Sequence, residues 1–481
     1  MSSKYETVIG LEVHVQLDTE TKVFCGCRNA FGAEPNTQVC PVCLGQPGVL
    51  PVLNKKAFEF AIKVAFALNC QVQKIIKFDR KNYYYPDLPK NYQISQYDMP
   101  IAYNGKLNVS DEAGKVREIG VTRAHLEEDA GKLIHDLSAP FSYVDLNRTG
   151  TPLLEIVSEP EIQSPEEAYH YLVTLKQIVK YLGVSDCNME EGSLRCDANI
   201  SLREEGAKEL GVKVEIKNLN SFKAVRDSLL HEEERQEDLL DEGGTIKQET
   251  RLWNDSKNVT VSMRTKEGAQ DYRYFPDPDL VPFEVEQETI REMKADIPEL
   301  PEAKRKRFTK EYALDESDIE VLIAEKDTAD FYEQVAAKAG DAKAACNWIK
   351  GEVMMHMNDR GTDIKGLGLD PENLARIIKM AVKGTISGLS AKEVLKANLE
   401  TGEDPVKIVK EKSLEQVSDE GTLDEAVTKV IEGNERSVND FKSGKENALS
   451  FLVGQVMKET RGKANPKLAG EMLRKKIAET R

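Results

Sequence analysis

The stretch TVIGLEVHVQLD, Thr7–Asp18, alternates apolar and polar residues from Ile9 onward. One set of alternate positions is apolar: Ile9, Leu11, Val13, Val15 and Leu17. The other set holds Gly10, Glu12, His14, Gln16 and Asp18. Because successive side chains of a strand point to opposite faces, this pattern predicts a strand with one buried face and one face that carries Glu12 and His14.

Four further stretches have strand-like patterns with charged residues on one face. In Thr122–Leu133 the residues that share such a face are Arg123, His125, Glu127 and Asp129, and in Leu194–Leu202 they are Arg195, Asp197, Asn199 and Ser201. In the third stretch, Lys213, Glu215 and Lys217 alternate with Val212, Val214 and Ile216. In the fourth, Glu155 lies inside the apolar strand Leu153–Val157. For each stretch alone, a solvated outer face is the usual explanation. Together they concentrate carboxylates, a histidine and fixed cations, which a merely solvated face does not need.

These polar faces lead to the hypothesis of a metal and nucleotide site on an open sheet. Glu12 and His14, two residues apart, would point the same way and share one ion, and Glu127 with Glu155 would complete a shell suited to Mg²⁺. Lysines and arginines on neighbouring strands would hold phosphates. The sequence contains no G-x-x-x-x-G-K-[ST] motif and no G-x-G-x-x-G after a strand, so the hypothesis does not rest on a known nucleotide-binding loop.

Four of the eight cysteines crowd into nineteen residues, at Cys25, Cys27, Cys40 and Cys43. Two close pairs separated by a segment that can turn back are typical of a zinc site. Four thiolates would fill the coordination shell, so the predicted zinc is structural and not catalytic. An iron–sulfur cluster is the lesser alternative, and four free thiols packed by chance are the other.

An aromatic and basic segment, Lys77–Pro100, combines five tyrosines with Lys77, Arg80, Lys81 and Lys90. Such a composition suits phosphates and stacked bases, as at a flexible end of a nucleic acid. A surface loop whose tyrosines pack on the rim of the sheet explains the composition equally well.

Helix signals place most helices in the second half of the chain. Ser164 as N-cap, Pro165 at N1 and Glu167 in a capping box predict a helix to Leu182, and Lys55–Leu68 and Phe222–Leu240 are two more by apolar periodicity. Strand signals disappear after Pro298. The helices expected beyond that point are Ala303–Gly366, Pro371–Gly384 capped by Asp370, Thr422–Glu432, Asn447–Glu459 and Pro466–Glu479.

The predicted fold class is therefore α+β, with an antiparallel or mixed sheet first and helices after it. The length of 481 residues predicts about three domains, which we place at 1–293, including the cysteine loop 25–43, then 294–402 and 403–481. No window is apolar enough to cross a membrane and the first residues lack the apolar core of a signal peptide, so we expect a cytoplasmic protein without membrane contact.

Charge is unevenly distributed along the chain. The net charge is −17, which argues against a protein that coats nucleic acid. Residues Phe441–Arg481, however, hold ten Lys or Arg against four Glu, a local charge of +6. A basic tail on an acidic body suits one localised contact with a polyanion, although a solvated basic helix would look the same.

Several long segments closely resemble the B subunit of the glutamine-dependent aspartyl/glutamyl-tRNA amidotransferases. The segments are VIGLEVHVQL, FDRKNYYYPDLPKNYQISQ, HLEEDAGK, VDLNRTGTPLLEIVSEP, EEGSLRCDANIS, EIKNLNSF, DYRYFPDPDL and FLVGQVMKETRGKANP. They run in order from the first strand to the tail. The resemblance implies a catalytic domain with a fold similar to glutamine synthetase and guanidino kinases, then a helical domain and a tail related to the YqeY family, with the last two contacting tRNA.

The resemblance also implies cofactors, partners and site residues. It implies ATP and Mg²⁺, a heterotrimer with an amidase (A) subunit and a small (C) subunit, and tRNA(Gln) or tRNA(Asn) as the carrier of the substrate. The family's metal positions fall on Glu12, His14, Glu127 and Glu155. The residues expected to contact the nucleotide are Lys81, Tyr83, Arg195, Asp197, Asn199 and Lys217. Zinc-binding cysteines occur in only some members, so zinc is expected to be dispensable to the chemistry.

The implied reaction converts the side-chain carboxylate of Glu-tRNA(Gln) or Asp-tRNA(Asn) to an acyl phosphate with ATP, and ammonia from the partner then gives the amide. Two other classes stay open at this stage. One is a free-standing ligase of the glutamine synthetase type that acts on a small amino acid, against which the basic tail and the aromatic segment argue. The other is an inert tRNA-binding scaffold, against which the carboxylate-rich strands argue.

Overall fold

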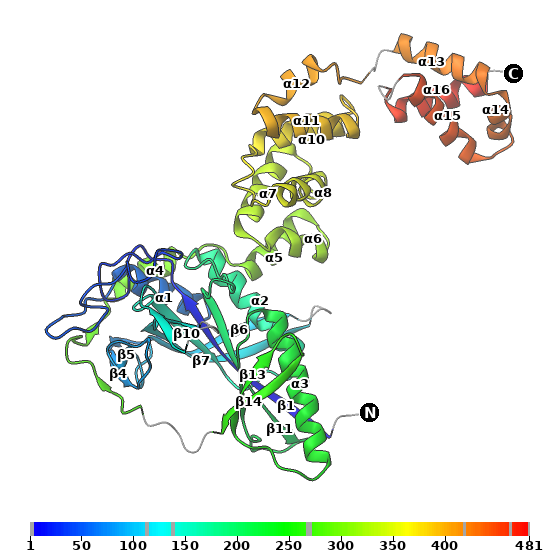
Figure 1. Ribbon diagram of the computed structural model, residues 1–481. Coiled ribbons are helices and arrows are strands. Elements are labelled where there is room, and N and C mark those ends of the chain that lie inside the picture. The colour runs from blue at the N-terminus through cyan, green and yellow to red at the C-terminus, as the bar shows by residue number, and fades with distance from the viewer. Residues whose placement is uncertain are drawn as a thin grey trace. The chain divides into compact units, whose positions relative to one another are not determined.

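The computed structural model describes residues 4–110, 115–135, 140–265, 272–416, 420–460 and 464–479. The chain divides into two compact units, residues 1–301 and 302–481. The first unit is built on strands with helices, and the described part of the second is mainly helical (Figure 1). The predicted α+β class is confirmed at this level, whereas the division into three domains stays a prediction.

A nine-stranded mixed sheet organises the first unit. Its order is β14 (Val259–Thr265), β13 (Glu249–Asn254), β12 (Val214–Lys217), β11 (Leu194–Glu204), β1 (Tyr5–Gln16), β10 (Pro152–Ser158), β7 (Val116–Glu128), β6 (Ala102–Ser110) and β2 (Gln71–Val72). Neighbouring strands are antiparallel, except β12 and β13, which are parallel. Strand β1 is therefore central, between β11 and β10.

Helices cover one face of this sheet and leave the other for polar side chains. Helix α1 (Lys55–Ala67) contacts β7, α2 (Pro165–Leu182) contacts β6, and α3 (Phe222–Asp241) contacts β11, along which it lies in Figure 1. On β1, Ile9, Val13 and Val15 are fully buried in the core below these helices. The predicted alternation of this strand is confirmed, and it sets which residues reach the opposite face.

The predicted helices of the first unit begin and end close to the expected residues. Ser164 caps α2 by accepting the N–H of Glu167 at 3.1 Å. The Glu167 carboxylate accepts the N–H of Gln163 at 2.7 Å and not that of Ser164, so half of the predicted capping box is replaced by a contact one residue earlier. Helix α4 (Gln287–Ala295) was not predicted.

Short strands lie outside the main sheet. β4 (Asp79–Asn82) pairs with β5 (Tyr92–Ser95) and β15 (Phe275–Pro276), β3 (Ile75–Ile76) with β16 (Phe283–Glu284), and β8 (Lys132–His135) with β9 (Ser142–Asp145). The strand predicted over Thr122–Leu133 is wrong at its end, because β7 stops at Glu128. At Gly131 a Cβ would lie 2.8 Å from the carbonyl oxygen of Asp145, so the chain beyond β7 passes through a space that only glycine fits.

The second unit consists of helices in its described residues. They are α5 (Pro301–Tyr312), α6 (Glu316–Ile323), α7 (Lys326–Ala339), α8 (Ala342–Trp348), a π-helical turn (Ile349–Val353), α9 (Met354–Arg360), α10 (Pro371–Val382), α11 (Gly388–Thr401), α12 (Pro405–Glu411), α13 (Glu420–Gly433), α14 (Glu435–Lys442), α15 (Glu446–Glu459) and α16 (Pro466–Glu479). One buried cluster spans Phe308 to Val409 and another Leu423 to Ile477. Among the described residues, no helix is both long and apolar enough to span a bilayer.

Candidate metal and nucleotide site

The strand register brings the predicted polar residues into rows across the sheet. His14 on β1 lies opposite Glu155 on β10 and opposite Arg195 on β11, and Glu155 in turn lies opposite His125 on β7. These four residues therefore form one row on the face that the helices leave open. A second row contains Glu12 opposite Asp197. Facing pairs of this kind lie about 5 Å apart at their Cβ atoms, close enough for their side chains to meet.

Three of the four predicted metal ligands come together. One ligand atom each of His14, Glu127 and Glu155 lies within 4.8 Å of the other two. The Nε2 of His14 lies 3.2 Å from the Glu155 carboxylate, and the Glu127 side chain is only 3% exposed. Opposite ligands of an octahedral Mg²⁺ are about 4.2 Å apart, so this set fits such an ion without rearrangement of the strands. Two carboxylates and an imidazole are also donors that other divalent ions accept.

Glu12 does not belong to this three-residue cluster. Its carboxylate accepts a hydrogen bond from the side-chain amide of Asn199 at 2.9 Å. Glu12 lies two residues from His14 on the same face, and two residues of a strand span about 6.6 Å, which places it in the next row. The structure thus brings Glu12 near Asn199 and Asp197, and its role as a metal ligand stays a prediction.

His125 lies between Glu127 and Glu155, although it was not among the predicted ligands. Its Nε2 lies 3.3 Å from Glu155 and 3.4 Å from Glu127. Burial lowers the pKa of His125, but the two carboxylates outweigh burial and raise it to about 9. Its Nδ1 is buried and has no hydrogen-bond partner among the described residues. The alternation of Arg123, His125 and Glu127 had already indicated that His125 shares the polar face.

Lys81 faces the cluster from the small sheet of β4 and β5. Its Nζ lies 5.0 Å from the ring centre of Tyr272 and 5.8 Å from that of Tyr83. Burial lowers the pKa of Lys81, but the charges of Glu127 and Glu155 outweigh it, so its pKa lies above the ordinary value. Burial raises the pKa of Tyr83. A lysine fixed as a cation beside two carboxylates is suited to an anionic ligand at the same place.

The remaining predicted cations are anchored by acidic neighbours. Arg195 donates to the buried carboxylate of Asp129 at 2.8 Å, and Asp129 also accepts from the Gln16 amide at 2.8 Å. Burial raises the pKa of Asp129, but Arg195 and Arg148 outweigh it, so the carboxyl stays ionised. Lys217 pairs with Asp197 and lies 3.4 Å from Glu215. These cations are therefore held in place on the polar face.

A cavity of about 440 Å³ opens beside this row of residues. Its lining includes Gln16, Arg148 and Arg195 from the polar network, and Phe31, Met189 and Leu219 from the surrounding loops. It therefore combines fixed cations and amides with apolar surface. This is the combination typical of pockets for small molecules with charged and aromatic parts.

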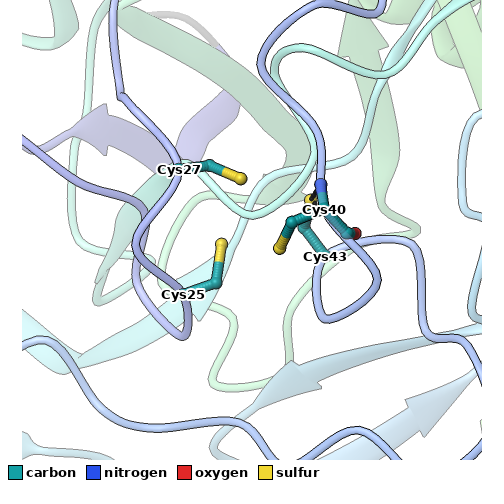
Figure 2. A group of neighbouring side chains, drawn as sticks. All are labelled: Cys25, Cys27, Cys40 and Cys43. Carbon is teal, nitrogen blue, oxygen red and sulfur yellow. Dashed lines mark hydrogen bonds between the residues drawn. The ribbon is translucent and has the colours of Figure 1, made fainter.

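The four cysteines converge as the sequence predicted. Figure 2 shows the Cys25–Cys27 segment facing the Cys40–Cys43 segment. The four sulfur atoms all lie within 4.8 Å of one another. In a tetrahedral zinc site with Zn–S bonds of about 2.3 Å, the sulfur–sulfur distance is about 3.8 Å. A hydrogen bond with Cys25 lowers the pKa of Cys43 to about 5, which favours the thiolate. The donor set fits a divalent metal held by four sulfurs.

The loop that carries the cysteines is fastened to the end of β9 and to the residues that follow it. Asn147 accepts the Gln38 N–H at 2.8 Å and donates to the carbonyl of Glu34 at 2.7 Å. Asn36 donates to the carbonyl of Val144 at 3.0 Å. Segment 144–147 thus holds the cysteine loop against the first unit.

Comparison with known proteins identifies the family of the chain. The model of the GatB/GatE catalytic domain matches residues 7–291, and the model of the GatB domain matches residues 330–477. The chain belongs to the GatB/GatE family. This GatB/GatE member is 55% identical over 478 residues to the B subunit of the aspartyl/glutamyl-tRNA(Asn/Gln) amidotransferase of Carboxydothermus hydrogenoformans, covering 99% of both chains.

Other relatives of this GatB/GatE member carry the same name. It is 55% identical to the B subunit of Caldanaerobacter subterraneus over 475 residues, 99% of this chain and 100% of the relative. It is 55% identical to that of Geobacillus thermodenitrificans over 473 residues, 98% of this chain and 99% of the relative. The resemblance drawn from the sequence motifs is therefore confirmed. The matched catalytic domain contains His14, Glu127, Glu155 and the cysteine loop.

Proposed function

We propose that this protein activates the side-chain carboxylate of Glu-tRNA(Gln), Asp-tRNA(Asn) or both with ATP, and that ammonia then converts it to the amide. The observation that carries the proposal is the cluster of His14, Glu127 and Glu155 beside Lys81 on the polar face of the sheet. Relatives named as the B subunit of aspartyl/glutamyl-tRNA(Asn/Gln) amidotransferase support it.

The chemistry requires activation because a carboxylate is a poor acyl donor. An oxygen of the substrate carboxylate attacks the γ-phosphorus of ATP, the bond to the bridging oxygen breaks, and ADP leaves. Ammonia then attacks the acyl carbon and phosphate leaves. Phosphoryl transfer depends mainly on positioning and charge neutralisation. His14, Glu127 and Glu155 would hold Mg²⁺, which would neutralise phosphate charge, while Lys81 and Arg195 orient the anionic groups by their fixed positive charge.

The cavity beside Arg195 is the part of the site that we assign to the nucleotide. Its fixed guanidinium groups suit phosphates, and the side chains of Phe31, Met189 and Leu219 suit a base. Gln16 lies two residues after His14 on the same face of β1, and Arg195 lies opposite His14 on β11. A nucleotide in the cavity would therefore direct its phosphates toward the metal cluster. Tyr83, Asp197, Asn199 and Lys217 are proposed as further contacts.

The proposed fold, domains, zinc and partner subunits rest on membership of the GatB/GatE family. We propose that the first unit has a fold similar to glutamine synthetase and guanidino kinases, with domains at 1–293, 294–402 and 403–481, and that the last two contact tRNA. The four cysteines would hold structural zinc. The ammonia would come from an amidase (A) subunit in a cytoplasmic heterotrimer that also contains a small (C) subunit, because the sequence has no evident amidase or glutaminase arrangement of its own.

One assay separates this function from the two alternatives. The chain is combined with its amidase and small-subunit partners, ATP, Mg²⁺, glutamine and Glu-tRNA(Gln) or Asp-tRNA(Asn) labelled on the amino acid. Labelled Gln-tRNA or Asn-tRNA supports the amidotransferase. ATP turnover with free glutamate or aspartate and no tRNA product would indicate a small-molecule ligase, and absence of any ATP turnover would indicate a scaffold.

Glu127→Gln tests the metal cluster within the same assay. The substitution keeps the size of the side chain but removes one of two negative charges from the ligand set, so amidation should be lost while the partner's glutaminase activity stays measurable. Glu118→Gln is the matched control, because Glu118 is exposed on the same strand and pairs with Lys106 at 2.6 Å. Normal amidation by Glu127→Gln would remove Glu127 from the metal site.

A further inference from the structure

Lys22 is an unusual residue next to the cysteine cluster, because it is a lysine with a fully buried side chain. Its Nζ donates to the carbonyl oxygen of Gln38 at 2.7 Å and lies 3.8 Å from the sulfur of Cys43. Gly150 packs against the stem of the lysine, where an added Cβ would lie 3.5 Å from Lys22 Cδ. The surrounding chain therefore closes over the ammonium group.

The charge of Lys22 lacks the partner that a buried lysine ordinarily has. Across the ranges that the structure describes, no carboxylate lies within ion-pair distance of its Nζ. Burial of an isolated charge is costly, so buried charges are paired or bound to a metal site. The neutral carbonyl of Gln38 accepts one hydrogen bond from the ammonium group but does not neutralise its charge. The group with the opposite charge that Lys22 reaches is the Cys43 sulfur.

The chemistry of a four-cysteine metal site supplies that opposite charge. Four thiolates around one divalent ion carry a net charge of −2. The Cys43 sulfur accepts a hydrogen bond from the N–H of Cys40 at 3.2 Å. This bond stabilises a thiolate but leaves the net charge of the metal site uncompensated. Lys22 lies 3.8 Å from this sulfur and is fully buried, so water screens its charge little.

We propose that Lys22 is the charge partner of a divalent metal bound by Cys25, Cys27, Cys40 and Cys43, and that it sets the affinity of this site. The inference rests on the metal site proposed above and adds a positioning residue to it. The simpler alternative is a structural lysine that only ties its loop to Gln38. A structural lysine would stabilise the metal-free and the metal-loaded protein equally, whereas a charge partner stabilises the loaded protein more.

Two substitutions separate these roles. Lys22→Met removes the charge and the donor, and Lys22→Gln removes the charge but keeps an N–H group that can reach the Gln38 carbonyl. Lys304→Met is the matched control, because Lys304 is 5% exposed but pairs with Asp330 at 2.7 Å and Glu333 at 2.9 Å in the second unit. All variants are made in the full chain, reduced and stripped of metal with a chelator.

The measurement is the affinity for Zn²⁺ by competition with a chromogenic chelator, together with thermal unfolding with and without Zn²⁺. Both Lys22 variants should bind Zn²⁺ about 10- to 100-fold more weakly, the effect typical of residues that support metal ligands. Their melting temperatures should fall more in the zinc-loaded than in the stripped protein. Lys304→Met should bind Zn²⁺ as the parent chain does and lose stability equally in both states.

Two results would overturn the inference. A loss of Zn²⁺ affinity below fivefold in both Lys22 variants would leave Lys22 a structural residue only. If a Cys25→Ser/Cys43→Ser double variant holds as much Zn²⁺ as the parent chain, the cysteines bind no metal and the charge partner has no site to serve. Neither result bears on carboxylate activation, which the amidation assay tests separately.

Discussion

Asp318 gives the sharpest test of how charge stabilises the second unit. It lies on α6, its side chain is 12% exposed, and it accepts from Lys343 at 2.8 Å and pairs with Lys350. The two lysines lie on α8 and on the π-helical turn, so one carboxylate joins three elements of the Phe308–Val409 core. Hydrogen bonds from Lys343 and then Lys350 lower the pKa of Asp318 from 3.8 to about 2.

The size of the effect follows from this pKa. A shift from 3.8 to about 2 corresponds to about 2 kcal/mol of stability, and half-exposed Lys343 reduces it to about 1–2 kcal/mol through solvent screening. Because the folded pKa is below the unfolded value, the stabilisation is complete above about pH 5 and is lost as the pH falls through 2. About half of it should be gone at pH 3.

The perturbation is Asp318→Asn, measured by urea unfolding of the full chain at several pH values. Fluorescence of Trp348, which packs on the same core, reports this unit, and a Trp253→Phe background removes the other tryptophan. The variant should lose about 1–2 kcal/mol at pH 7 and about half as much at pH 3. The control is Asp315→Asn, at an exposed residue 3.0 Å from the same Lys343, which should lose less than about 0.5 kcal/mol. Equal losses in both variants, or a loss that does not depend on pH, would refute the reasoning.

Three further outcomes are expected. Cys43→Ser should remove zinc from the purified chain, by metal analysis, while ATP-dependent amidation stays measurable; loss of amidation would give the metal a role in the chemistry. Arg195→Met should raise KM for ATP about tenfold or more with a smaller change in KM for tRNA, and equal changes in both would take Arg195 out of the nucleotide site. Lys467→Glu with Lys475→Glu, both exposed on α16, should weaken tRNA binding and lower the salt dependence of log K by about 2, and unchanged binding would make the tail a solvated surface.

The sequence predicted the faces of the strands better than their alignment. Alternation along β1 was enough to place His14 on the polar face of the strand and Val13 and Val15 on its buried face, because that alternation is a local property. The membership of the cluster is not local. It depends on β10 pairing with both β1 and β7 so that His14, Glu155 and His125 share a row, and this register is set by contacts between residues far apart in the sequence, such as His14 and Glu155.

The errors in the prediction have the same cause. The predicted end of β7 was too late, because a close approach between Gly131 and Asp145 lies beyond Glu128 and no local pattern records it. Glu12 and His14 share a face as predicted but lie in neighbouring rows, and the role of Glu12 as a metal ligand stays a prediction. In the second unit the long helical stretch after Ala303 is broken into shorter helices, with a π-helical turn at Ile349–Val353. Helix ends there follow packing in the Phe308–Val409 core more than propensity.

The segment from Asp145 to Thr151 links the cysteine loop to the polar face of the sheet. Asn147 holds the cysteine loop by its hydrogen bonds to Gln38 and Glu34, and Thr151 donates to Asn29 of the same loop at 3.0 Å. Between them, Arg148 donates to the carbonyls of Ala130 and Gly131 and lies 3.6 Å from Asp129, the carboxylate that anchors Arg195.

One short segment therefore fixes both the cysteine loop and the guanidinium groups of the proposed nucleotide cavity. The same loop also supplies Asn29 and Phe31 to the wall of that cavity. Removal of the metal should consequently change the binding of nucleotide before it changes the sheet, because the strands that carry His14, Glu127 and Glu155 are held by their own ladder of hydrogen bonds. A metal at the proposed four-cysteine site would in this way support the geometry of the proposed nucleotide cavity without touching the nucleotide.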